Sequence, residues 1–313
     1  MTTIAIVKPG MLTSIQDLGR WGMQARGVPV AGPMDEYSHR LANHLVGNDA
    51  SAAALEVTLI GPEIEADHDV TCAVAGAQFA ILVNDVPAPM HAPFVLRAGA
   101  RLRFSERKHG ARATIAFRGG IDVEPVFGSR ATSLVARMGP LDGRALRSGD
   151  RLPIGDPARP SQPRRRDDAM PPALTVTDGG ARVRVVRGPH DDLFTSAAFE
   201  KLFQSRFTIT PQSNRMGYRL DGPSLAHRGT ADILSDATAI GSLQVPASGL
   251  PILLMADRQT TGGYPKIATV IGADLPLAGQ LAPGDWIEFR PCTREAAREA
   301  AVARFGALEG LSR

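Results

Sequence analysis

Residues 251–270 read PILLMADRQTTGGYPKIATV, two apolar runs that flank a polar loop with a Gly-Gly pair. Each run is short, rich in Ile, Leu or Val, and bounded by Pro, Gly or Asp, which is typical of strands. Residues 257–266 are therefore predicted to join two strands, with Asp257 at the point where the first strand leaves the core. The stretch indicates a β fold that carries a polar loop.

The same pattern of short apolar runs bounded by turn residues recurs along the chain, for example in TIAIVKPG from Thr3, ARVRVVRGP from Ala181 and FTITP from Phe207. Helical patterns are fewer: we expect helices within residues 34–48, 191–205 and 293–308. Their predicted N-caps are Asp35, either Asp191 or Asp192, and Thr293. The sequence thus predicts a mainly β protein with a few short helices.

A weak internal repeat links LRAGARLRF from Leu96, LRSGDRLPI from Leu146 and LAPGDWIEF from Leu281. Each copy reads as a turn at its Gly followed by a strand. With 313 residues, two domains are more plausible than one. We predict a first subdomain at residues 1–160, a Pro-rich and charged linker at 161–173, and a second subdomain with a C-terminal helix at 174–313.

Composition and missing patterns exclude several classes of protein. A net charge of +3 is too small to indicate a nucleic-acid partner. The spacing of the two cysteines predicts neither a disulfide framework nor a metal site. No P-loop, Gly-x-Ser-x-Gly elbow or dinucleotide fingerprint is present. Without an apolar leader or a membrane-length run, the protein is expected to be soluble and cytoplasmic, with no membrane partner.

The loop at 257–266 is the main candidate site. Asp257 is read either as a turn former or as a functional carboxylate. The Gly262-Gly263 pair lets a ligand approach the backbone closely. Tyr264 and Lys266 offer a donor and a positive charge to a carboxylate, a carbonyl or a phosphate.

Three other positions add polar groups to this picture. Gln244 stands in an apolar strand, where its amide either satisfies the backbone or lines a pocket. Arg215 belongs to a segment that reads either as a hairpin turn or as a carboxylate clamp. Asp35 precedes a predicted helix, so capping competes with a role in catalysis.

Several ordered motifs together resemble one family. They are GMLTSIQDLGRWGMQARGVPVAGPMDEYSHRLANHLVGND, FRGGIDVEPVFGSRAT, SNRMGYRLDGP, GSLQVPASGLPILLMADRQTTGGYPKIATVIGAD and LAPGDWIEF. The chain resembles the biotin-dependent carboxyltransferase family, which includes allophanate hydrolase subunit 2, the C subunit of 5-oxoprolinase, KipA-like kinase-inhibitor antagonists and the carboxyltransferase part of urea carboxylase. The resemblance runs from about Met11 to about Phe289 and implies two cyclophilin-like β-barrel domains.

The resemblance also implies a set of functional residues. Those assigned to catalysis are Asp257, Lys266 and Arg215, and those assigned to substrate binding are Asp35, Asn214, Gln244, Gln259, Thr260 and Tyr264. Further polar positions that match the family are Gln16, Asp17 and Asn43. Arg215 and Lys266 would bind an oxyanion or a carboxylate, and Asp257 would act as a base or an orienting acceptor. One departure is Asp236, where the family more often has Glu.

By this resemblance the chain is a subunit of an ATP-dependent enzyme that processes a small amide or lactam, active only with partner subunits. ATP and any carboxybiotin would come from those subunits, because the chain has no biotinylation signature or nucleotide loop. The implied partners are a smaller KipI-like subunit, similar to allophanate hydrolase subunit 1 or to the B subunit of 5-oxoprolinase, and a third subunit that acts on the lactam. Two alternatives stay open: a non-catalytic regulatory protein that binds the KipI-like partner, and a carboxylate-binding module.

Overall fold

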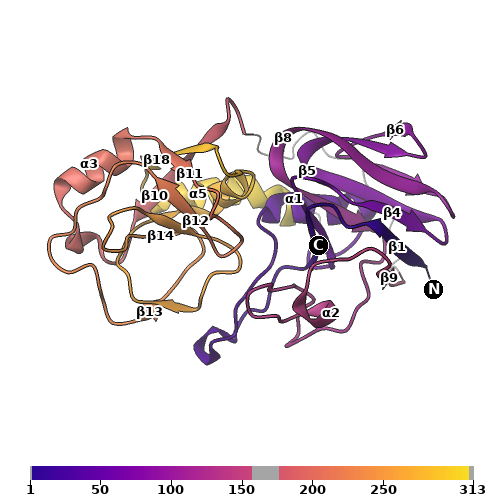
Figure 1. The fold of residues 1–313 in the computed structure, drawn as a ribbon, viewed down its shortest axis with the longest axis horizontal. Helices are drawn as coiled ribbons and strands as arrows, with labels where there is room; N and C mark the ends of the chain where they lie inside the picture. Colours follow the sequence, from indigo (N-terminus) through magenta and orange to yellow (C-terminus); the bar gives the residue numbers. More distant parts are fainter. Residues whose placement is uncertain (1, 157–175, 310–313) are drawn as a thin grey trace. The chain divides into compact units, whose positions relative to one another are not determined.

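A computed structural model describes residues 2–156 and 176–309 (Figure 1). Contacts along the chain divide it into two compact units. Unit 1 comprises Met1–Arg20, Ala31–Thr175 and Phe305–Arg313, and unit 2 comprises Trp21–Val30 and Val176–Arg304. The predicted linker at 161–173 lies outside the described residues, and the predicted subdomain bounds stay a prediction.

Unit 1 is built on a curled nine-stranded sheet in the order β2-β3-β8-β4-β1-β9, with β5, β6 and β7 joined through β8 and β5. The strands are β1 (Thr3–Lys8), β2 (Leu12–Gln16), β3 (Ala54–Thr58), β4 (Glu63–Ala66), β5 (Val70–Val83), β6 (Val86–Ala88), β7 (Pro93–Leu96), β8 (Arg101–Phe117) and β9 (Arg151–Pro153). The helices are α1 (Glu36–Val46) and the short α2 (Pro140–Gly143).

The two faces of this sheet carry different side chains because successive strand residues point to opposite sides. On β5, Cys72 and Val74 belong to the main aliphatic core of unit 1. The intervening Ala73 and Ala75 instead belong to a second cluster with Tyr37 and the other apolar residues of α1. Small alanines on that face let the helix pack closely against the strands.

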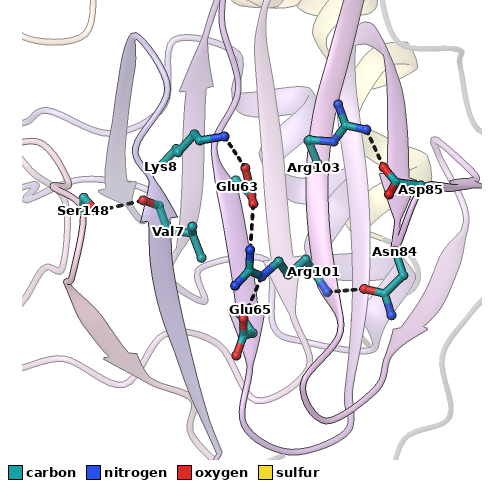
Figure 2. Close-up of polar contacts among 9 residues, drawn as sticks. All are labelled: Val7, Lys8, Glu63, Glu65, Asn84, Asp85, Arg101, Arg103 and Ser148. Atoms are coloured by element: carbon teal, nitrogen blue, oxygen red, sulfur yellow. Dashed lines mark hydrogen bonds and ion pairs between the residues drawn. The ribbon is translucent and has the colours of Figure 1, made fainter.

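Charged side chains line β1, β4 and β8 of unit 1, as Figure 2 shows. The Lys8 Nζ lies 2.8 Å from Glu63 Oε2, and the Arg101 Nε lies 2.9 Å from Glu65 Oε2. Glu65 is paired directly with Arg101 in the β4–β8 register. Opposite charges across neighbouring strands favour this register over a shifted one.

Unit 2 is a closed barrel in the order β10-β17-β14-β15-β12-β11-β18. The strands are β10 (Gly180–Arg187), β11 (Phe207–Ile209), β12 (Gly217–Asp221), β14 (Ser242–Gln244), β15 (Ile252–Leu254), β17 (Lys266–Val270) and β18 (Trp286–Pro291). The barrel closes where β10 pairs with β18 in parallel; its other pairs are antiparallel. Outside the barrel, β13 (Asp236–Ala237) and β16 (Thr261–Gly262) form a small two-stranded sheet.

Unit 2 also contains the helical segments η1 (Gln24–Arg26), η2 (Asp191–Leu193), α3 (Ser196–Gln204), η3 (Gly272–Asp274) and α4 (Leu275–Gly279), and α5 (Arg294–Glu309) follows β18. In Figure 1 the loop that carries β13 lies away from α3 within the orange part of the chain. The predicted mainly β fold with a few short helices is confirmed.

Two of the predicted helix caps are confirmed and one is wrong. The Asp35 carboxylate accepts a bond from the Ser38 N–H at 2.9 Å, and the Thr293 hydroxyl accepts one from the Ala296 N–H at 3.1 Å. In the third case residues 191–193 form only the 3-10 turn η2, and α3 starts later, with Thr195 as its cap. The chain is extended at Phe194, which separates the turn from the helix.

The three copies of the internal repeat have the same local structure. In each, the N–H after the glycine bonds to the carbonyl three residues earlier: Ala100 to Arg97, Asp150 to Arg147, and Asp285 to Ala282. Each glycine has a positive φ, the backbone region that favours Gly, and a strand follows directly. The prediction of a turn followed by a strand is confirmed for all three.

Candidate functional site

The register of β12 and β15 brings Arg215 and Asp257 together. Gly217 pairs with Leu254, and beyond this pair the Asp257 N–H donates to the Arg215 carbonyl at 2.8 Å. The two side chains then meet: Arg215 Nε lies 3.1 Å from Asp257 Oδ2, and Nη2 lies 3.2 Å from Oδ1. Both side chains are buried, with 4% and 0% exposure. The guanidinium therefore binds both oxygens of a carboxylate that water does not reach.

Two amides lie against the glycine pair of the loop. Gln244, at the end of β14, accepts a hydrogen bond on Oε1 from Gln259 Nε2 at 3.0 Å. Its own Nε2 donates to the Tyr264 carbonyl at 3.4 Å. A Cβ added at Gly262 would lie 2.5 Å from Gln244 Nε2, so a side chain at this position would displace the amide.

A buried lysine begins β17. Lys266 is 2% exposed, and its Nζ donates to Asp236 Oδ2 at 2.8 Å. Asp236 comes from β13, which pairs with β16 at Gly262. The hydrogen bond from Lys266 is the main cause of the lowered pKa of Asp236. Lys266 and Asp236 thus form a charged pair with one buried end and one half-exposed end.

His190 joins this pair, and sequence reasoning gave it no functional role. Its Nδ1 accepts a bond from the Lys266 backbone N–H at 3.3 Å, and its Nε2 lies 3.8 Å from Asp236 Oδ2. An accepting Nδ1 places the proton of the neutral ring on Nε2, which faces the carboxylate. The only sequence signal was a cluster of His and Asp at 190–192, read as the start of a helix.

Three further predicted residues lie on the same unit in more open positions. Tyr264 is 40% exposed and lines a groove of about 810 Å³ together with Pro246, Leu250 and Ile252. Thr260 is half-buried, and its carbonyl accepts a bond from the Thr238 N–H. Asn214 is exposed, and its Oδ1 accepts a bond from the Met216 N–H at 2.8 Å, which closes the turn before β12.

The predicted residues of unit 1 are bonded within that unit. Asp35 caps α1 and accepts a second bond from the Ser38 hydroxyl at 2.6 Å. Gln16 donates to the Thr132 carbonyl at 3.0 Å, and Asn43 donates to the Ala52 carbonyl at 2.9 Å. Asp17 accepts a bond from the Ser129 hydroxyl at 2.6 Å. The structure thus shows these side chains in hydrogen bonds that stabilise the fold of unit 1.

Arg258 is a second residue to which sequence reasoning gave no role. It follows Asp257 directly and is 6% exposed. Its Nε donates to the Thr238 carbonyl at 3.3 Å, just after β13. Arg258 therefore belongs to the same cluster as the amides, Lys266 and Asp236, where the polar loop of β16 meets β13.

Metal-binding clusters and membrane-spanning helices are both absent from residues 2–156 and 176–309. No group of three or more His, Cys, Asp or Glu side chains there could hold a metal ion. Within the same ranges, no helix is long and apolar enough to cross a membrane.

Comparison with known proteins decides the family. The model of the carboxyltransferase domain, subdomain A and B, matches residues 26–291. The chain belongs to this family. It is 39% identical over 297 residues to the C subunit of 5-oxoprolinase from Escherichia coli strain K12, covering 95% of this chain and 94% of the relative. It is also 33% identical to urea amidolyase of Saccharomyces cerevisiae, covering 99% of this chain but 18% of that protein.

The fold agrees with these relatives. The crystal structure of Kluyveromyces lactis urea carboxylase matches with a TM-score of 0.94 at 31% identity, covering 99% of this chain and 29% of that one. The carboxyltransferase resemblance seen in the motifs is therefore confirmed. The chain spans nearly all of the bacterial subunit and less than a third of the yeast protein.

Proposed function

We propose that the chain is a subunit of an ATP-dependent enzyme that opens a small lactam or amide, equivalent to the C subunit of 5-oxoprolinase. The observation that carries this proposal is the near full-length similarity to that bacterial subunit, of which the match covers 94%. The polar cluster around residues 257–266 supports it, because it joins a buried cation to amide groups.

In this proposal Lys266 polarises the carbonyl of the substrate. Its Nζ uses one donor on Asp236 and has further protons for a carbonyl oxygen. Burial strengthens that interaction, since few waters compete with it. Asp236 holds the ammonium group from one side, and His190 contacts Asp236 and the Lys266 backbone N–H rather than the ammonium group itself.

The two glutamines would recognise the amide edge. Gln259 donates its Nε2 to Gln244, and that bond fixes which way its Oε1 can face. The Oε1 would accept the N–H of the lactam, while Thr260 and Tyr264 would bind the rim of the ring. Gly262 leaves room for both amides beside the backbone.

Asp257 and Arg215 have a different proposed role from Lys266. Each is already bound by the other, so we assign Asp257 as the orienting acceptor rather than as the base. The pair would fix the loop and leave proton transfer to other groups. Asp35 and Asn214 keep their proposed places in substrate binding.

The loop does not have the geometry of a phosphate-binding loop for a nucleoside triphosphate. A phosphate loop leads into a helix whose N-terminal N–H groups bind the anion, whereas Gly262 and Gly263 are followed by strand β17. We therefore assign ATP, and carboxybiotin if the reaction uses it, to partner subunits. Those partners would be a smaller KipI-like subunit and a third subunit that acts on the lactam.

The experiment is ATP-dependent release of glutamate from 5-oxo-L-proline by the chain with and without these partner subunits. In the proposed reaction the ring C–N bond breaks, one water supplies the new carboxylate oxygen and the ring nitrogen becomes the protonated amine of glutamate, while a second water is consumed as ATP becomes ADP and phosphate. We expect turnover only with the full set. An equal rate when the chain is omitted would rule out this function, and a stable but inactive complex would favour the regulatory alternative.

A further inference from the structure

The charges around the polar loop of unit 2 do not balance. Asp257 neutralises Arg215, and Asp236 neutralises Lys266. Arg258 has no carboxylate among its contacts within the part of the chain that the structure describes. The cluster therefore holds one positive charge more than it can pair.

The Arg258 side chain is bound by the backbone of the segment that follows β13. Its Nε donates to the Thr238 carbonyl at 3.3 Å. Thr238 is itself fixed, because its N–H donates to the Thr260 carbonyl at 3.0 Å and its hydroxyl donates to the Gln259 carbonyl. The guanidinium thus bonds to a segment that is itself bonded to the loop residues carrying the candidate amide and hydroxyl groups.

The two Nη groups of Arg258 have no hydrogen-bond partner within residues 2–156 and 176–309, the part of the chain that the structure describes. They are also not among the side-chain atoms of that part of the chain that are buried from solvent without a hydrogen-bond partner. They therefore reach solvent although the residue is only 6% exposed. A guanidinium presents its N–H groups as a planar fork that matches the two oxygens of a carboxylate.

An unpaired charge at such depth is costly for a folded protein. Burial lowers the pKa of Arg258, which is the expected effect of removing water from a cation without supplying an anion. Ionisable side chains whose pKa is shifted by burial cluster at functional sites.

We propose that Arg258 is the specificity residue of this site and that its two Nη groups bind the carboxylate of a small amide or lactam substrate. The identity of the substrate rests on the proposed function, but carboxylate binding can be measured separately. Gln259, the next residue, would then face the amide of the same molecule. Because Arg258 and Gln259 are adjacent in the sequence, they suit a compact substrate that carries both a carboxylate and an amide.

The test uses the full chain, alone and in its complex with the partner subunits, and calorimetric titration with pairs of probes. One pair is 5-oxo-L-proline and 2-pyrrolidinone, its neutral analogue without the carboxylate. The second pair is oxamate and oxamide, in which a neutral amide replaces the carboxylate. In Arg258→Gln we expect binding of both carboxylates to weaken about tenfold to a hundredfold, as for the loss of a charge-assisted bidentate contact. Binding of the neutral analogues should change less than about twofold on the same argument.

Two variants separate this effect from misfolding. Arg258→Lys keeps the positive charge but loses the planar pair of N–H donors. Its affinity for carboxylates should therefore lie between the affinities of the wild type and of Arg258→Gln. Arg228→Gln is the matched control. It removes an exposed guanidinium whose Nε donates to the Phe194 backbone carbonyl at 2.8 Å, and it should leave the affinity for all four probes unchanged. Thermal unfolding of each variant shows whether the fold is kept.

The outcomes separate the two proposals. Oxamate binding that depends on Arg258, in a complex that does not turn over 5-oxo-L-proline, supports the carboxylate site and rejects the substrate. Turnover of 5-oxo-L-proline with an unchanged KM in Arg258→Gln supports the function and rejects the carboxylate site. Equal affinity for charged and neutral probes in the wild-type complex also rejects it.

Discussion

Arg215 and Asp257 bind each other through two contacts, Nε to Oδ2 at 3.1 Å and Nη2 to Oδ1 at 3.2 Å, with both side chains buried. The sequence presents them as two candidate catalytic groups 42 positions apart. The structure shows them as one neutral unit that joins the segment before β12 to the loop after β15. Their pairing determines which other charges of the loop can meet a substrate.

Breaking this pair should destabilise the protein strongly. Asp257→Asn or Arg215→Met alone removes one member of a buried ion pair, and we expect a loss of about 3–5 kcal/mol in the free energy of unfolding. Combining Arg215→Met with Asp257→Leu should recover most of that loss while activity stays low. Urea denaturation of the four proteins measures this. Asp69→Asn, which removes a surface ion pair with Arg97, is the control and should not move the midpoint. If both single variants were as stable as the wild type, the Arg215–Asp257 pair would not be what holds the loop in place.

Lys266→Met should remove catalysis with little effect on assembly. If Lys266 polarises the substrate carbonyl, kcat should fall by about a hundredfold or more, the usual effect of losing one such donor. Asp236→Glu keeps the carboxylate partner and should retain most of the activity. Lys201→Met, at an exposed lysine that donates to the Ser224 carbonyl, is the matched control. Steady-state kinetics of the complex gives the result, and a kcat for Lys266→Met within a few fold of wild type would remove Lys266 from the mechanism.

Gly262→Ala should disturb substrate binding more than stability. The new Cβ would lie 2.5 Å from Gln244 Nε2 and 3.1 Å from Gln259 Nε2, so the amide pair must move. Both atoms are ends of flexible side chains, and we expect a stability loss of only about 1 kcal/mol but a clear rise in KM. Gly229→Ala meets no atom within 4 Å and should leave KM unchanged. Equal KM values for the two variants would show that the amides do not contact the substrate.

His39 predicts a pH dependence of stability in unit 1. Burial is the main cause that lowers its pKa from 6.5 to about 4. Between these values the unfolded chain binds the proton more readily than the folded one, so stability should decrease as pH falls from 6.5 towards 4. The full effect is about 3 kcal/mol. His39→Gln keeps a hydrogen-bonding group near Asn43 and should flatten this part of the curve. Urea unfolding at several pH values is the measurement; an equally steep decrease in His39→Gln would assign it to other groups.

Much of the fold was predictable because its signals are local. Short apolar runs between turn residues gave the strands of both units, including β15 and β17 on either side of the polar loop. The small sheet of β13 and β16 was not predicted, since Asp236 and Ala237 are exposed and carry no apolar alternation. The helix cap at Thr195 was missed because two aspartates upstream offered a stronger local signal.

The candidate site was predictable as a loop but not as a set of contacts. Residue types alone indicated that 257–266 carries binding groups. Which charges cancel depends on strand register, which places Arg215 beside Asp257 and Asp236 near Lys266. That information is not local in sequence, and neither His190 nor Arg258 could be recognised without it.

The central claim is that this chain is an obligate subunit of an ATP-dependent lactam-opening enzyme. Its most direct test is glutamate release from 5-oxo-L-proline by the complex with the KipI-like and lactam-acting subunits, measured with wild-type chain, with Lys266→Met, and with the chain omitted. The account predicts ATP-dependent glutamate release with the wild-type chain and almost none in the other two samples. Release at the same rate in all three would contradict it.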